Sequence, residues 1–489
     1  MYEASLALSV VVFAAVLAWY LRSGCASVFH PLTIYCAFHG FLFVLRPIIA
    51  RIHGYEAVYS FMDFHPSDGD KTTVILAASL GFVAFAGFCL HTGNVPMRFV
   101  QDAAVREERR RFTRAFLWVA ALAGPPALYS LSKIYSGSDF IYDGLQLDAR
   151  TGVVINTSQV GYVTELQLML VPLLAIPLWL SRFRPLFLVP ILAFVLLRAG
   201  SGGRGPFVIA LAAAGLFYLY EQRRRLPTVR ILVGAALVLA LFGMVGDDRG
   251  ESVRTTFGLQ GGPATVHEVR TTRMEGMDFA NMEYFEYLVY VVPRLSGTYD
   301  YFLDNLQLFT EPVPRIYWPG KPIGEPFQRI WLTEYGRPYG MTRSLPGEGW
   351  YALGWPGVVI WCGLWGWVLG AIYRRFAAGS QTTIHTAAYL VFLPTLILGF
   401  RDGMLLTMVK QSAFYLAPIG AWFLVARLKG IPDAPTLRRA LVRARSAPAP
   451  APATATAAAP TTAWAHLPPA VRRRRMALAH QPGEAAEEA

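Results

Sequence analysis

The stretch TTVILAASLGFVAFAGFCL, residues 72–90, decides the fold class of this chain. It contains no charged side chain. An α-helix of this length, rising 1.5 Å per residue, extends about 28 Å. The hydrocarbon core of a bilayer is roughly 30 Å thick and takes about 20 apolar residues to cross. We therefore expect residues 72–90 to form a membrane-spanning helix.

The rest of the chain repeats this pattern. Hydrophobic residues make up 54% of the 489 residues and charged residues only 16%, which is too apolar for an ordinary soluble protein of this size. Further apolar segments lie at 5–21, 31–50, 113–131, 161–180, 185–199, 205–220, 231–245, 350–372, 383–399 and 403–426. We predict an all-α integral membrane protein with about 11 transmembrane helices.

These segments divide the chain into four regions. Residues 1–245 are expected to form an N-terminal bundle of about eight helices, and residues 350–428 about three C-terminal helices. Between them, residues 246–349 form one large loop, which is far longer than a connector. After about residue 430 the composition changes to Ala, Pro and Thr, so residues 429–489 are predicted to be a disordered tail.

The basic residues predict the orientation. Arginine clusters follow the segments that end near residues 90, 180, 220 and 372, and such loops face the cytoplasm. Arg427 and Lys429 follow the last segment, so the C-terminus is predicted inside and the N-terminus outside. Because the net charge of +12 lies in these short clusters, we do not expect nucleic acid as a partner. The four cysteines lack ligand spacing, and we expect no disulfide framework, metal or cofactor.

Several charged side chains fall in or beside apolar segments, near the predicted outer leaflet. They are Arg46, Glu165, Arg198, Arg204, Arg401, Asp402 and Lys410. Each alone would be able to snorkel to the interface, but together they suggest a cationic cavity that opens outward. The loop RAGSGGRGP, residues 198–206, breaks the positive-inside pattern with glycine and arginine, a combination suited to phosphate. The alternative reading of this loop is a tight helix-to-helix turn.

The large loop has three patterned parts. The aromatic stretch from Phe279 to Phe309 predicts one or two amphipathic helices lying on the outer surface. VPRIYWPGKP, residues 313–322, is a rigid segment that carries Arg315 and Lys321. RSLPGEGWYALGWPG, residues 343–357, places Glu348 at the entry to the next helix, where a carboxylate suits a general base. Alternatively, Glu348 is an acidic residue favoured by the positive end of the helix dipole.

Four of these motifs, in this order, resemble the bacterial O-antigen polymerase family, also called oligosaccharide repeat unit polymerases or Wzy-type proteins. They are HPLTIYCAFHGFLFVLRP at 30–47, SGGRG at 201–205, PRIYWPGKP at 314–322 and GEGWYALGWPG at 347–357. The resemblance spans most of residues 28–425. Each motif is short and rich in Gly and Pro, so their order and position carry most of the weight.

The resemblance implies a multi-helix glycosyltransferase architecture of the GT-C-like kind and a metal-independent enzyme. Such an enzyme joins repeat units held on undecaprenyl pyrophosphate at the periplasmic face of the bacterial inner membrane, for O-antigen, capsule or exopolysaccharide. Glu348 matches the acidic motif position, and Glu348 and Arg204 are the expected catalytic residues. Arg204, Arg315 and Lys321 match positions that would hold the pyrophosphate, and Arg198, Arg294 and Arg343 join them on location. Expected partners are the lipid-linked oligosaccharide, membrane lipids, a chain-length regulator and a flippase.

Other functions stay open from the sequence. A ligase of the same broad class would transfer the glycan to a different acceptor, and sequence barely separates it from a polymerase. A flippase or other transporter would explain many helices and a cationic cavity, but it is expected to show midplane charges and internal repeats. A membrane acyltransferase would need a reactive histidine, and the large loop offers only His267.

Overall fold

The computed structural model describes residues 1–135, 145–147, 154–156, 161–200, 204–229, 231, 233, 234, 237, 275, 279–313, 317, 318, 321, 327–338, 341–379 and 382–446. The chain separates into two units, Met1–Leu437 and Arg438–Ala489.

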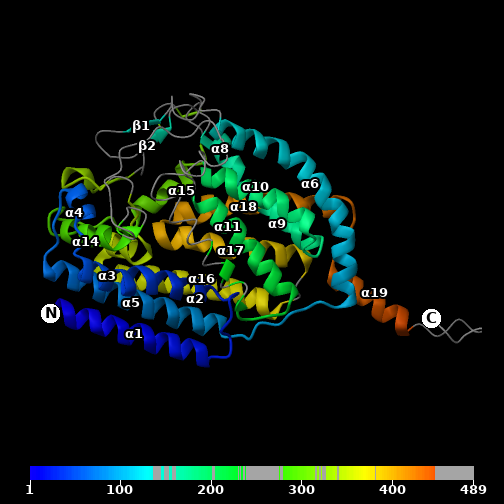
Figure 1. Ribbon diagram of the computed structural model, residues 1–489, viewed down its shortest axis with the longest axis horizontal. Coiled ribbons are helices and arrows are strands. Elements are labelled where there is room, and N and C mark those ends of the chain that lie inside the picture. The colour runs from blue at the N-terminus through cyan, green and yellow to red at the C-terminus, as the bar shows by residue number, and fades with distance from the viewer. Residues whose placement is uncertain are drawn as a thin grey trace, which may run out of the picture. The chain divides into compact units, whose positions relative to one another are not determined.

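The described part of the chain is helical apart from one short antiparallel pair of strands, β1 (Leu145–Leu147) and β2 (Val154–Asn156), in which Gln146 lies opposite Ile155. The helices, labelled in Figure 1, are α1 Tyr2–Arg22, α2 Pro31–His39, α3 Arg46–His53, α4 Ala57–Met62, α5 Asp68–Gly93, α6 Ala103–Tyr135, α8 Gly161–Glu165, α9 Leu170–Leu180, α10 Leu188–Gly200, α11 Arg204–Glu221, α14 Asn281–Val291, α15 Gln307–Thr310, α16 Leu345–Ala378, α17 Thr383–Asp402, α18 Leu405–Leu428 and α19 Ala434–Ser446.

Seven of the described helices are long and apolar enough to cross a membrane. They are Tyr2–Arg22, Pro31–His53, Asp68–Gly93, Ala103–Lys133, Tyr162–Leu180, Leu345–Ala378 and Thr383–Asp402. The π-helical segment Gly40–Leu45 joins α2 and α3 into the second of these, and the 3-10 segment Leu166–Met169 joins α8 and α9 into the fifth. Pro185–Ala199 and Gly205–Glu221 are shorter apolar helices. This confirms the prediction of a helical, multi-pass membrane protein. The count of about 11 spans stays a prediction, and most of the expected segment 231–245 lies outside the described residues.

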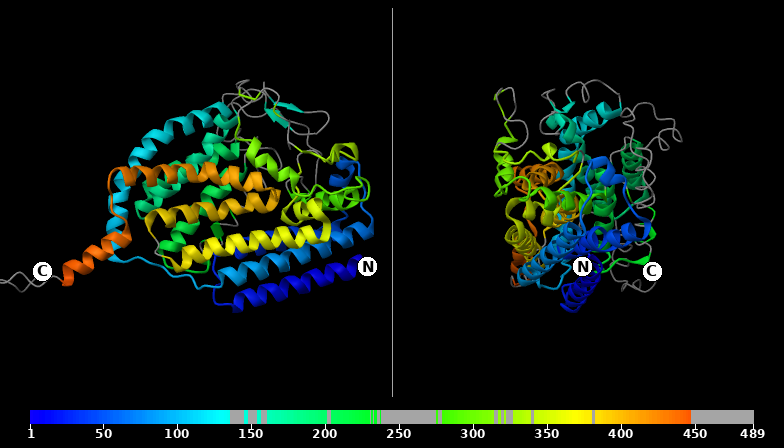
Figure 2. Two further views of the ribbon diagram at one scale, coloured as in Figure 1. Left: turned by 180° about the vertical axis from the view of Figure 1, so that it is seen from behind. Right: turned by 90° about the vertical axis from the view of Figure 1, so that its left-hand side faces the viewer.

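Residues 72–90 lie within helix α5, which packs between two other long helices. Helix α5 runs beside α1 on one side and α16 on the other (Figures 1 and 2). Glycines allow the close approach of α16, because a Cβ on Gly366 would lie 2.3 Å from the carbonyl oxygen of Phe85, and one on Gly370 would lie 2.6 Å from that of Cys89. Small residues at helix contacts are the usual means of close packing between membrane helices.

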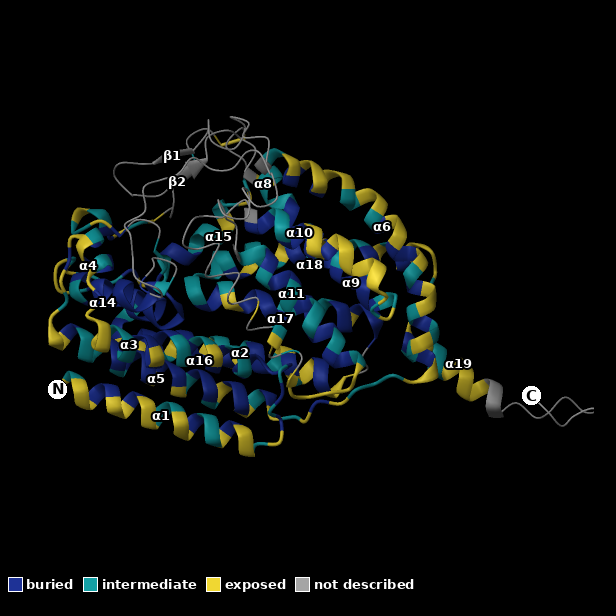
Figure 3. Ribbon diagram, in the orientation of Figure 1, coloured by how far each residue is buried: buried dark blue, intermediate teal, exposed yellow. Residues whose placement is uncertain are grey.

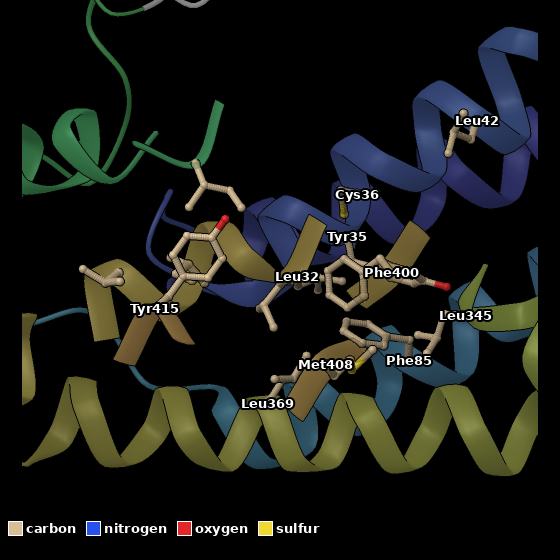
Figure 4. Close-up of a cluster of buried hydrophobic side chains, with 14 of the residues drawn as sticks. Leu32, Tyr35, Cys36, Leu42, Phe85, Leu345, Leu369, Phe400, Met408 and Tyr415 are labelled. Atoms are coloured by element: carbon tan, nitrogen blue, oxygen red, sulfur yellow. The ribbon is translucent and has the colours of Figure 1, made fainter. Parts of the chain in front are cut away.

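The helices differ in how far their side chains are buried. Figure 3 shows α5 largely buried, whereas α1 and α6 keep exposed residues along much of their length. Among these exposed side chains are large apolar ones, such as Val11 of α1 and Leu122 of α6, as expected for surfaces that face lipid. In the interior, Tyr35 of α2 packs against Phe85 and Phe400, with ring centroids 4.1 and 4.8 Å away (Figure 4).

Two predictions about the polar regions are wrong. The aromatic stretch of the large loop does form helices, but α14 is buried along nearly its whole length instead of lying on the outer surface. Its glutamates have buried partners, which lets the polar side of the helix pack inward. The predicted disordered tail begins too early, because Ala434–Ser446 is helical, and Asp433 accepts a hydrogen bond from the amide of Thr436 as its cap. Residues 447–489 lie outside the described residues.

Candidate functional site

The site begins where α16 enters the bundle. Ser344 caps the helix, and Glu348 follows in its first turn. The helix breaks at Leu353 and Gly354, and Gly354 has φ +63° and ψ −141°, a conformation open essentially to glycine alone. The break brings Gly349 against Gly357, where an added Cβ on Gly357 would lie 2.0 Å from the Gly349 oxygen. The glycines of GEGWYALGWPG therefore build a tight bend that fixes the short segment carrying Glu348.

Glu348 is completely buried, and both of its carboxylate oxygens have partners. The side-chain amide of Asn305 donates to Oε1 at 2.8 Å. Nη1 of Arg343 donates to Oε2 at 3.0 Å. A buried carboxylate needs such charged and hydrogen-bonding partners to remain folded away from water.

Arg343 holds a second carboxylate. Its Nη1 lies 2.8 Å from Oδ2 of Asp304, which is also buried. The guanidinium stacks on the ring of Tyr351, 3.9 Å from the centroid. One arginine therefore joins Asp304 of the large loop to Glu348 of the GEGWYALGWPG motif. We call Asp300, Asp304, Asn305, Arg343 and Glu348 the Glu348 cluster.

The turn of the large loop around Asp300 is held by hydrogen bonds to α16 just before its break at Leu353 and Gly354. The amides of Asp300 and Tyr301 donate to the carbonyls of Tyr351 and Ala352, at 3.1 and 2.8 Å. Those carbonyls precede the bend at Leu353 and need partners from outside the helix. The sharp bend of α16 thus supplies the docking point for the large loop.

Asp300 is an acid of the cluster with a raised pKa. Burial, followed by the charge of Asp304, raises the pKa of Asp300 to about 8. Its Oδ2 accepts a hydrogen bond from the backbone amide of Asp304 at 3.1 Å. A raised pKa favours the neutral form of Asp300 near pH 7. The guanidinium of Arg343 then has fewer buried negative charges to balance than if all three carboxyl groups were ionised.

The corner between α17 and α18 closes the cluster. Gly403 has φ +82°, and an added Cβ would lie 2.2 Å from the oxygen of Ser344 and 3.0 Å from Cβ of Glu348. The carbonyl of Gly403 accepts from Trp361 at 2.9 Å, and the amide of Leu405 donates to Oδ1 of Asn305 at 2.8 Å. Only glycine fits this corner without displacing the helix that carries Glu348.

The other site residues predicted from sequence are distributed elsewhere. Arg294 forms an ion pair with Asp70 at 2.6 Å, and its side chain is about half exposed (54%). Lys321 lies 3.5 Å from Glu311, which also pairs with Lys410 at 3.3 Å. Of the predicted residues whose side chains are described, Glu348 and Arg343 are the pair that the structure brings into contact.

Three more predicted site residues are Arg198 and Arg204, on either side of the loop between α10 and α11, and Arg315. Arg198, near the end of α10, is buried. Arg204 begins α11, but its side chain lies outside the described residues, as does all of Arg315.

A second buried cluster surrounds α14 and contains Arg46, which we had expected in an outward cavity. Nη2 of Arg46 lies 2.6 Å from Glu283, and both side chains are almost fully buried. Glu286, one turn later, accepts a hydrogen bond from the Tyr59 hydroxyl at 2.6 Å. Burial first, and then the charge of Glu283, raise the pKa of Glu286 to about 8, although the Tyr59 hydrogen bond acts against this. Arg46 therefore anchors a loop helix to the bundle.

Sequence reasoning missed the loop half of the Glu348 cluster. Asp300 and Asp304 stand four residues apart in an aromatic stretch, a spacing that would have suggested two acids close together in space. Asn305 and Gly403 carry no comparable local signal, because each is defined by a partner far along the chain.

Comparisons of the chain with protein-family models, with curated proteins and with solved structures gave no match.

Proposed function

We propose that this protein is a membrane glycosyltransferase that polymerises oligosaccharide repeat units carried on polyprenyl pyrophosphate. The observation that carries the proposal is the Glu348 cluster, in which Arg343 joins Glu348 to Asp304 of the large loop. The resemblance of the motifs supports the reaction class, and the cluster supports Glu348 as its acid–base residue.

The proposed reaction uses a carboxylate and arginines. The acceptor hydroxyl attacks the anomeric carbon of the donor sugar, and its proton passes to Glu348. The bond from that carbon to the pyrophosphate oxygen breaks, and the electron pair leaves with the pyrophosphate. Preorganised arginines stabilise the charge that develops on this leaving group, so the scheme needs no metal ion.

Arg343 has a particular part in this scheme. Because it pairs with two carboxylates in the closed cluster, an incoming pyrophosphate competes with them for the guanidinium. When Arg343 transfers to the pyrophosphate, Glu348 loses its counter-charge and becomes a better proton acceptor. Arg204, Arg315 and Lys321, at the matching motif positions, are further proposed ligands of the pyrophosphate. Arg198 and Arg294 are proposed on their location, and Arg294 and Lys321 would have to leave their present partners Asp70 and Glu311 to bind it.

The proposed location is the bacterial inner membrane, with the N-terminus and the large loop periplasmic and the C-terminus cytoplasmic. About 11 spans and a GT-C-like arrangement belong to the same proposal. A flippase that delivers the repeat units and a regulator of chain length are the expected partners.

The test is the gel pattern of surface glycan from a deletion strain complemented with variants. Glu348→Gln and Arg204→Ala, shown to be inserted at wild-type level, should yield single capped repeat units instead of a ladder. Glu286→Gln is the matched control, because it replaces the carboxyl group of a different buried glutamate by an amide and should preserve the ladder. A full ladder from the Glu348→Gln strain would show that the site assignment is wrong.

The same assay separates the alternatives. Loss of a ligase leaves polymer that is not attached to its acceptor. Purified protein that fails to elongate lipid-linked units but moves them across vesicles would support a transporter.

A further inference from the structure

A basic cavity lies at the opposite end of the bundle from Glu348. It has a volume of about 230 Å³ and is lined by four arginines, Arg106, Arg109, Arg182 and Arg223, and one acid, Glu221. Thr383, which begins α17, also lines it, whereas Asp402 at the other end of α17 adjoins the corner over Glu348. A helix of 20 residues is about 30 Å long, so the two sites are separated by about one bilayer core.

One wall of the cavity is firmly built. Nη1 of Arg109 pairs with Glu221 at 2.8 Å, and the guanidinium stacks on Trp179, 4.5 Å from the ring centroid. The indole nitrogen of Trp179 donates to the same carboxylate at 3.1 Å. Glu221 is thereby committed to Arg109, and its charge is balanced within the wall.

The remaining arginines keep their positive charge for a ligand. Arg223 donates to the neutral amide oxygen of Gln101 at 3.2 Å. Within the described ranges, the guanidinium groups of Arg106 and Arg182 have no acceptor. Four arginines against one glutamate leave an excess of three positive charges around the cavity.

Two of these arginines are placed at the cavity by the ends of helices. Arg182 and Arg223 follow the C-terminal ends of α9 and α11 and have φ of +58° and +54°. Helices commonly end with a residue in this left-handed conformation, and here the amides of Phe183 and Arg224 donate to the carbonyls of Leu178 and Leu219. The two helix ends therefore bring two arginines to one cavity.

We infer that this cavity binds a phosphate group, carried either by an anionic phospholipid or by a small soluble phosphate compound. Its volume is below the 300–1,000 Å³ range typical of drug-sized ligands and suits a headgroup or a free phosphate. Guanidinium groups bind phosphate oxygens in bidentate fashion. Basic pockets between membrane helices on the cytoplasmic side are suited to anionic lipid headgroups, and the positive-inside rule assigns this end to the cytoplasm. The inference does not depend on the proposed reaction.

The experiment measures binding to the purified full chain in neutral detergent. One arm titrates phosphatidylglycerol or cardiolipin against phosphatidylcholine, and retained lipid is read by native mass spectrometry. The other arm titrates pyrophosphate and reads thermal stabilisation. Arg106→Gln with Arg182→Gln should weaken binding about tenfold or more, because two charged hydrogen-bond donors are lost. Arg110→Gln with Arg114→Gln is the matched control, since it removes the same charge from exposed positions of α6 outside the cavity and should bind as wild type.

The two arms identify the source of the phosphate. Selective retention of anionic lipid that depends on Arg106 and Arg182 supports a headgroup site. Stabilisation by pyrophosphate with the same dependence supports a soluble ligand. Equal loss in both double variants, or no selective binding in either arm, overturns the inference.

Discussion

Removing the guanidinium of Arg343 should strongly destabilise the protein, because this group neutralises two buried acids at once. Asp304 and Glu348 lie 2.8 and 3.0 Å from it, and neither carboxylate side chain is exposed. In Arg343→Met these carboxylates face each other without a counter-charge. Removing one partner of a buried ion pair typically costs 3–5 kcal/mol, so we expect a loss of about 4 kcal/mol.

The partner variant should cost less. In Glu348→Gln the amide oxygen still accepts from Asn305, and Arg343 keeps Asp304, so we expect a loss of about 1–2 kcal/mol. The double variant should lose less than the sum of the single losses, by about 2 kcal/mol, because contacting charges are coupled. Equilibrium unfolding in mixed micelles with increasing dodecyl sulfate, followed by tryptophan fluorescence, measures the four free energies. A cost below about 1 kcal/mol for Arg343→Met, or additive losses within about 0.5 kcal/mol, would refute the buried three-group arrangement.

Three further predictions use the same unfolding measurement. Gly354→Ala should lower the free energy of unfolding by about 1–3 kcal/mol, because the residue has a positive φ. Gly420→Ala, at a helical position with open space around it, is the control and should be neutral or slightly stabilising. Equal effects of the two substitutions would count against the bend in α16. Because the folded-state pKa values of Asp300 and Glu286 are raised to about 8, the folded state binds protons more tightly, so stability should fall as the pH rises from about 4 to 8 and level off above. Asp300→Asn and Glu286→Gln should each remove part of that fall, and an unchanged pH profile would contradict their burial as acids. Glu108→Ala should cost about 2–4 kcal/mol, because two buried backbone amides and one hydroxyl lose their acceptor; a neutral result would show that water replaces the carboxylate.

Much of the helical framework follows from local sequence. The predicted segment 72–90 lies within α5, 383–399 within α17, and 403–426 closely matches α18. The segment 113–131 is a part of the longer helix α6, because the basic residues before it continue the same helix toward the inferred cytoplasmic side. Helix boundaries were less accurate than helix positions, since polar residues extend a helix without changing its hydropathy signal.

Local sequence predicts only part of the Glu348 cluster. Glu348 and Arg343 stand five residues apart, and their contact reflects one local motif. The loop acids reach them through a turn that docks on the broken end of α16, and no periodicity records that docking. The aromatic stretch from Phe279 to Phe309 is accordingly predicted to lie on the outer surface, whereas α14 is buried and forms an ion pair with Arg46.

The sequence by itself determined that this chain enters a membrane, because the transfer of apolar side chains into lipid is summed along each segment and requires no knowledge of its neighbours. Only the tertiary structure decided which charges meet. Arg46 and Glu283 are 237 residues apart, and Asn305 lies 43 residues before Glu348. Pairing across such distances is set by which helices pack together and by glycines such as Gly403, where the backbone of Ser344 comes close. The site therefore forms only when the bundle packs.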